Sequence, residues 1–136
     1  MTIRIGTSGW SYEHWKDRFY PAQLAKHRWF EFYAKQFDTV EVNATYYRMF
    51  KDSTYRKWRE QAPEDFRYVL NVPLLISHRH KQHDVEGLIT EFCRSARLLR
   101  NKLGLLLLQL PPDMTCMPER IATALDAVVQ GRALVD

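Results

Sequence analysis

Glu41 and Asn43 are the residues in this sequence whose types and spacing are best suited to chemistry. They alternate with Val40 and Val42 within residues 39–48, so the polar pair is expected on one face of a strand and the valines on the other. A carboxylate on a covered strand costs several kcal/mol unless it is paired or hydrogen-bonded. Glu41 is therefore a candidate general acid or base, with Asn43 orienting a ligand. The alternative is a structural carboxylate held by backbone amides or by an arginine such as Arg4.

Polar residues also stand at the carboxyl ends of the other predicted strands. The strands expected at 2–7, 66–73 and 105–110 carry Ser8, Asn71 and Gln109 at or near their ends. In barrels of parallel strands, active sites are built at this end. We therefore expect these three side chains to bind a substrate at one common mouth together with Glu41.

Histidines are concentrated in one segment. Residues 76–84 contain three of the five histidines, but no HExxH or Cys/His spacing frames them, and Arg79 and Lys81 oppose a bound cation. We predict no metal site and no cofactor. His78 is a candidate acid, base or anion ligand next to the third strand, and the alternative is a solvated basic loop.

Aromatic residues are concentrated between the first strand and the first helix. Such a segment either packs as a lid over the sheet end or presents rings on which a base or sugar stacks, and packing is the better expectation. Trp10 and Tyr12 are the candidates for stacking because they follow the strand most closely. Tyr46 and Arg48 stand in the same relation to the second strand, and Arg48 could hold a phosphate.

The composition is that of one globular domain. The 136 residues are 46% hydrophobic and 26% charged, and the longest apolar run is far shorter than the roughly 20 residues of a membrane helix. No signal peptide is evident, so we expect a cytoplasmic protein without a membrane partner. A net charge of +4 favours small anionic or phosphorylated ligands, and supports nucleic acid only weakly because the basic residues are scattered. Cys93 and Cys116 are expected to be free thiols.

Strand patterns alternate with helical ones along the whole chain. Helices are expected at 26–37, 53–61, 85–102 and from 118 onward, and a fifth strand at 132–136. Such β-α repeats predict an α/β fold with parallel strands, either an open doubly wound sheet or a closed barrel.

Several ordered motifs resemble the YecE-like family over nearly the whole chain. They are Gly6-Thr7-Ser8-Gly9-Trp10, Phe19-Tyr20-Pro21, Phe32-Tyr33-Ala34, Thr39-Val40-Glu41-Val42-Asn43 and Gln109-Leu110-Pro111-Pro112. The resemblance implies a TIM-type barrel, a domain of unknown function, and no cofactor. Members of the family often carry a lysine on the third strand in a Lys-x-Pro context, where this chain has Asn71. The resemblance therefore supplies no cation there for anion binding or carbonyl activation.

The chain has about half the roughly 250 residues of an eight-unit barrel. We expect residues 1–136 to form one incomplete domain, the first half of a TIM-type barrel truncated in its fifth strand. Open sheet edges beside apolar side chains then predict self-association. For function, the first hypothesis is a hydrolase- or lyase-like enzyme using Glu41 and His78. The alternatives are a noncatalytic module for a nucleotide, nucleic acid or sugar phosphate, and an inactive truncated fragment.

Overall fold

The structure is a computed structural model that describes residues 2–74, 85–109, 122, 125, 126, 128 and 129. Its α-helices are α1 (Trp29–Gln36), α2 (Ala44–Tyr47), α3 (Asp52–Gln61) and α5 (Val85–Ala96), and its strands are β1 (Gly6–Ser8), β2 (Thr39–Val42), β3 (Arg67–Asn71) and β4 (Leu103–Leu107). The described part of the chain also contains the 3₁₀ helices η1 (Glu13–Trp15), η2 (Lys26–Arg28) and η3 (Arg97–Lys102).

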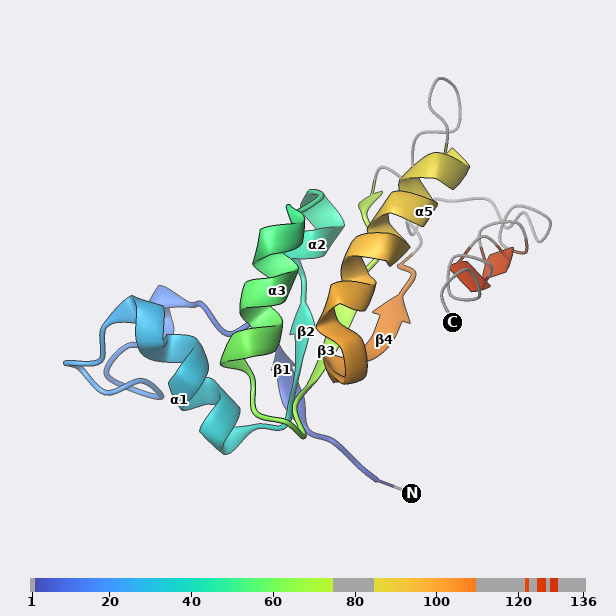
Figure 1. Cartoon of the computed structure of the whole chain (residues 1–136). Coiled ribbons are helices and arrows are strands. Elements are labelled where there is room, and N and C mark those ends of the chain that lie inside the picture. The colour runs from blue at the N-terminus through green and yellow to red at the C-terminus, as the bar shows by residue number, and fades with distance from the viewer. Residues whose placement is uncertain (1, 75–84, 110–121, 123–124, 127, 130–136) are drawn as a thin grey trace.

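The four strands form one parallel sheet in the order β1-β2-β3-β4, each paired with the next strand along the chain. Figure 1 shows α3 and α5 side by side across the strands, with α1 beyond α3. Sequential parallel strands joined by helices are the arrangement of the first half of a TIM-type barrel. The predicted α/β fold of parallel β-α repeats is therefore confirmed.

The core lies between the helices and one face of this sheet. Val40 and Val42 of β2 and Tyr68 and Leu70 of β3 are buried there, which is the face the alternation in the sequence assigned to them. The helices contribute the residues predicted from helical spacing, including Trp29, Phe30, Tyr33, Tyr55, Trp58, Ile89, Phe92, Ala96 and Leu99. Many of the aromatic residues of the chain are therefore used to pack this core.

The other face of the sheet is open within the described part of the chain. Strand pairing sets Ser8, Glu41, Val69 and Leu105 in one row across it. Leu105 is 63% exposed and Leu107 is 41% exposed, so the prediction of uncovered apolar side chains on this face agrees with the described residues. The polar residues of the row therefore lie on the side away from the helices.

Several predicted boundaries differ from the observed ones. The first strand begins at Gly6 rather than at residue 2, and Ile3 and Ile5 are 77% and 70% exposed. The second strand ends at Val42, because the chain turns into the single helical turn α2, where Thr45 Oγ lies 2.8 Å from the Val42 carbonyl oxygen. Its side chain gives that carbonyl a partner after the ladder stops.

The junction before β4 also differs from the prediction. The helix expected at 85–102 is divided: α5 ends at Ala96, and Arg100 within η3 has a positive φ of 54°. Gly104 lies inside β4 at a register shift, where an added Cβ would come 3.1 Å from the Tyr68 carbonyl oxygen. Its lack of a side chain therefore allows the two strands to approach closely.

Some predictions fall on residues outside the described part of the chain: His78, Cys116, most of the helix expected from 118 onward and the strand expected at 132–136. Cys93 is buried and forms no disulfide with a described residue, in agreement with the prediction. Among the helices that the structure describes, none combines the length and the apolar character needed to cross a bilayer.

Candidate functional site

Four polar side chains at the carboxyl ends of β1, β2 and β3 form one hydrogen-bonded chain. Asn71 Nδ2 donates to Glu41 Oε1 and to Asn43 Oδ1, each at 2.9 Å, and Asn43 Nδ2 donates to Ser8 Oγ at 2.6 Å. We call these four residues, Ser8, Glu41, Asn43 and Asn71, the mouth cluster. They come from three separate predicted strands, and the sequence placed all four at this end.

Asn71 is the buried centre of the mouth cluster. It is 2% exposed, Glu41 and Asn43 are half-buried, and Ser8 is exposed. Both amide hydrogens of Asn71 are used, whereas its buried Oδ1 accepts no hydrogen bond from the residues that the structure describes. An unsatisfied buried amide oxygen costs about 1–3 kcal/mol, so the cluster carries one acceptor whose need for a donor is unmet.

The backbone holds each member of the cluster in place. Ser8 and Glu41 are paired across β1 and β2, and the Gly9 amide donates to the Glu41 carbonyl oxygen at 2.8 Å just beyond that pair. Thr45 Oγ lies 2.7 Å from the Asn71 carbonyl oxygen, which fixes the end of β3 against α2. The cluster therefore stands on strand ends rather than on free loops.

Behind β1, the buried hydroxyl of Tyr33 joins the first two strands. It accepts a hydrogen bond from the Thr7 amide at 2.9 Å and donates to the Thr39 carbonyl oxygen at 3.0 Å. Burial raises the pKa of the Tyr33 phenol, so the hydroxyl keeps its proton at neutral pH. This contact positions the strand that carries Ser8.

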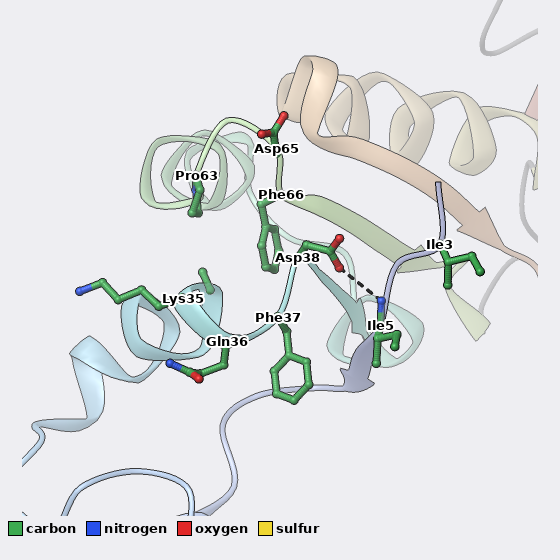
Figure 2. Close-up of a pocket in the computed structure, with 10 residues that line it drawn as sticks. Ile3, Ile5, Lys35, Gln36, Phe37, Asp38, Pro63, Asp65 and Phe66 are labelled. Atoms are coloured by element: carbon green, nitrogen blue, oxygen red, sulfur yellow. Dashed lines mark hydrogen bonds between the residues drawn. The ribbon is translucent and has the colours of Figure 1, made fainter. Parts of the chain in front are cut away.

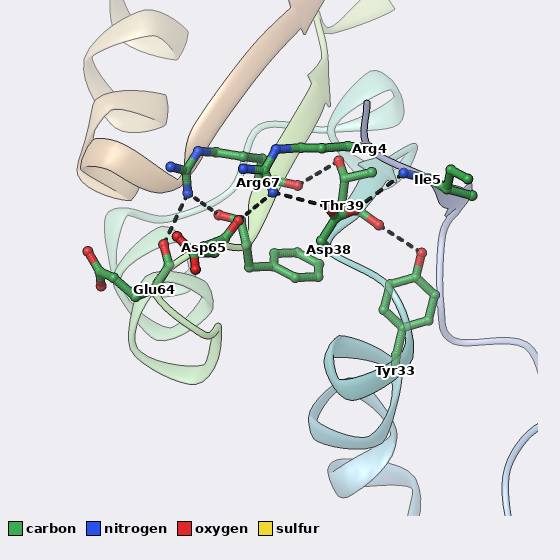
Figure 3. A network of polar contacts seen from close by, with 9 residues as sticks. Arg4, Ile5, Tyr33, Asp38, Thr39, Glu64, Asp65 and Arg67 are labelled. Carbon is green, nitrogen blue, oxygen red and sulfur yellow. Dashed lines mark hydrogen bonds and ion pairs between the residues drawn. The ribbon is translucent and has the colours of Figure 1, made fainter. Parts of the chain in front are cut away.

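Arg4 does not pair with Glu41, so that form of the structural alternative is wrong. Its guanidinium contacts Asp38 Oδ2 at 3.2 Å and the Asp65 carbonyl oxygen at 2.6 Å, before β2 and β3 begin (Figure 3). Arg48 lies over the Phe50 ring, 4.4 Å from its centroid. Among the described residues, the contact made by the Glu41 carboxylate is the one with the Asn71 amide.

The predicted aromatic ligands are mostly occupied in packing. Trp10 makes edge contacts with Phe30 and Trp58, so it lies over the helices and not on the mouth. The Tyr12 hydroxyl donates to the Ser8 carbonyl oxygen, which keeps this residue close to the cluster. Tyr46 is half-buried against Tyr47. The lid interpretation of the aromatic segment is thus the better one for Trp10.

The remaining candidates are Gln109 and His78. Gln109 is exposed two residues beyond β4, and the structure shows no contact between it and the mouth cluster. His78 lies outside the described residues. Within the described part of the chain, no group of three or more His, Cys, Asp or Glu side chains is arranged to hold a metal ion.

Two hollows lie away from the mouth cluster, and the sequence did not indicate either. A groove of about 550 Å³ is bounded by residues preceding β1, β2 and β3, among them Ile5, Phe37, Asp38 and Phe66 (Figure 2). It is therefore at the amino ends of the strands. A second groove of about 470 Å³, between α1 and α3, has Trp10 in its lining; its basic members are Lys26, His27 and Lys57.

A parallel β-α sheet whose strand ends carry a connected polar cluster defines a TIM-type α/β protein with its candidate site at the barrel mouth. The match to a family model agrees with this class. The chain belongs to the family described as "Protein of unknown function DUF72", whose model matches residues 4–135.

Individual relatives give the same result. The chain is 36% identical over 109 residues to UPF0759 protein YecE of Escherichia coli, covering 80% of this chain and 38% of the relative. It is 28% identical over 127 residues to UPF0759 protein YunF of Bacillus subtilis, covering 88% and 44%. The chain thus spans less than half the length of these two curated relatives.

Two solved structures share the fold. A DUF72 family protein of Enterococcus faecalis matches with a TM-score of 0.74 at 25% identity, covering 96% of this chain and 47% of that one. A DUF72 family protein of Thermotoga maritima matches with a TM-score of 0.77 at 24% identity, covering 96% and 52%. The β-α arrangement is therefore that of known DUF72 proteins, and this chain spans about half of each.

Proposed function

We propose that the mouth cluster is the active site of a hydrolase- or lyase-like enzyme. Glu41 acts as the general acid or base, and Asn43, Asn71 and Ser8 orient the ligand. The observation that carries this proposal is the unbroken hydrogen-bonded chain from Ser8 through Asn43 and Asn71 to Glu41 on the open face of the sheet. Such a carboxylate is fixed by a neutral amide and keeps acceptor capacity for a substrate proton.

The fold supports this assignment. In TIM-type proteins the residues at the carboxyl ends of the strands form the active site, whereas the opposite end serves stability. Glu41 lies at the carboxyl ends of the strands, and the ion pair of Arg4 with Asp38 lies at the amino ends. His78 follows β3 in the sequence and stays a candidate second acid or base in this proposal.

A screen of chromogenic esters and glycosides with the 136-residue chain tests the proposal. Removing a general acid or base lowers kcat/KM by about 10²–10⁴-fold, so we expect that loss in Glu41→Gln. Glu60→Gln, at an exposed position of α3, is the matched control and should leave turnover unchanged. Equal turnover by the two variants would refute a catalytic role for Glu41.

A second candidate is a noncatalytic module for an anionic, ring-containing ligand such as a nucleotide. The observation in its favour is the groove between α1 and α3, which combines the Trp10 ring with Lys26, His27 and Lys57. Phosphate binding there would follow the positive charge, away from Glu41. Loss of nucleotide binding in Lys57→Gln, with no effect of Glu41→Gln, would favour this function over the enzyme.

A further inference from the structure

We propose that the mouth cluster recognises a primary ammonium group, so that the substrate or ligand is a small amine and not a phosphate ester. This inference rests on the proposed function because both concern the mouth cluster. It adds the chemical class of the ligand. It follows from which polar atoms of Glu41 and Asn71 lack donors, from their burial, and from the fixed orientation of one amide.

The first step is the balance of acceptors and donors. A carboxylate only accepts, with about four lone-pair positions, and the described contact of Glu41 fills one of them. Asn71 Oδ1 is a further acceptor with none of its positions filled. Side by side, these two groups leave an excess of acceptors at the centre of the cluster, and a ligand that fits must bring donors.

The second step is that the Asn71 amide cannot turn to remove this excess. Exchanging Oδ1 and Nδ2 would set the single amide oxygen of Asn71 2.9 Å from both Glu41 Oε1 and Asn43 Oδ1, and both of these atoms are acceptors. The orientation with Nδ2 toward both residues is therefore fixed by its surroundings. The unpaired oxygen is a built feature of the site.

The third step is charge. Arg4 is bound to Asp38, Arg48 lies on Phe50, and the Arg67 guanidinium donates to the carbonyl oxygens of Glu64 and Phe66. Within the part of the chain that the structure describes, none of these three cations contacts Glu41, and in our proposal its negative charge attracts a cation and repels phosphate.

The fourth step is size. Asn71 Oδ1 is buried, so the donor group that we propose beside Glu41 must be compact to reach it. An ammonium offers three donors on one nitrogen, whereas a guanidinium is a broad planar fork. Ser8 is exposed and paired with Glu41 across the strands, which leaves an approach from the open face.

Side-chain amide NMR of the ¹⁵N-labelled 136-residue chain tests the inference, with methylammonium as the probe. Methanol is the uncharged match in size, and inorganic phosphate is the anion. We expect methylammonium to shift the amide signals of Asn71 and Asn43 saturably at millimolar concentration, with little response to methanol or phosphate. Glu41→Gln should weaken methylammonium binding at least tenfold, and Glu60→Gln should leave it unchanged.

A response to phosphate, an equal response to methanol, or undiminished binding by a folded Glu41→Gln variant would overturn the inference. Ser8→Ala serves as a second variant if Glu41→Gln does not fold; it should weaken methylammonium binding two- to fivefold, and unchanged affinity in it would also count against the site. Turnover of an uncharged substrate that depends on Glu41, without amine binding, would refute this inference and leave the proposed enzyme intact. Amine binding without any Glu41-dependent turnover would support this inference and refute the proposed enzyme.

Discussion

Replacing Tyr33 by phenylalanine should destabilise the protein, whereas the same replacement at Tyr55 should not. Both side chains are fully buried tyrosines on helices that pack against the sheet. They differ at their hydroxyls: the Tyr33 hydroxyl bonds to Thr7 and Thr39, and the Tyr55 hydroxyl has no hydrogen-bond partner among the described residues. The pair therefore isolates the contribution of a satisfied hydroxyl.

The expected magnitudes follow from these contacts. Tyr33→Phe strips one donor from the Thr39 carbonyl and one acceptor from the Thr7 amide, both only partly buried, which costs about 2 kcal/mol in unfolding free energy. Tyr55→Phe removes a polar atom that was buried without compensation, so the free energy should stay level or rise by about 1 kcal/mol. The two variants should therefore differ by about 2–3 kcal/mol in unfolding free energy.

Urea denaturation followed by circular dichroism measures this difference. Amide hydrogen exchange at Thr7 adds a local readout, because its N–H donates to Tyr33 in the folded chain. Exchange at Thr7 should quicken in Tyr33→Phe and stay unchanged in Tyr55→Phe. Equal unfolding free energies of the two variants would show that the hydrogen bonds of the Tyr33 hydroxyl do not stabilise the fold.

Three further predictions concern other contacts. Thr45→Val keeps the side-chain shape but removes the proton shared by two buried carbonyl oxygens, so urea denaturation should show a loss of about 1–2 kcal/mol. Hydrogen bonds from Arg94 and Ser95 lower the pKa of Asp52 in the folded chain. The stability gained in this way is present above the unfolded pKa near 3.8 and is lost as the pH falls below it. In Asp52→Asn, the unfolding free energy should therefore decline less steeply below about pH 4 in an acid titration. Leu105→Lys places a charge on the open face at the β4 edge, and light scattering over a dilution series should show less self-association than in the parent chain.

The sequence predicted the sheet and the mouth cluster because both depend on local periodicity. Alternation placed Glu41 opposite Val40 and Val42, and the structure agrees because strand side chains must alternate. Asn43 lies just beyond β2 and has helical backbone angles, so alternation does not explain its position. The role of Trp10 was harder to predict, since a ring after a strand can stack on a ligand or pack on a helix. Only the tertiary position of α3 decides that it meets Trp58.

The partner of Glu41 could not be predicted for a similar reason. Arg4 precedes β1, the neighbour of β2 in the sheet, but its ion pair forms with Asp38, which precedes β2 at the same end of the sheet. Asn71 reaches Glu41 because the register between β2 and β3 sets Glu41 beside Val69, two residues earlier on β3. Register is a property of two strands together, and neither strand's sequence states it alone.

The polar contacts at the two ends of the open face differ in kind. At the amino ends, Arg4 and Arg67 are bound to Asp38 and to backbone carbonyls, so their charges fasten the chain segments entering β2 and β3 (Figure 3). At the carboxyl ends, a carboxylate is held by a neutral amide whose own oxygen is unpaired. An arginine in place of that amide would neutralise the charge of Glu41. In our proposal, a carboxylate that is held by a neutral amide keeps its charge available for a ligand.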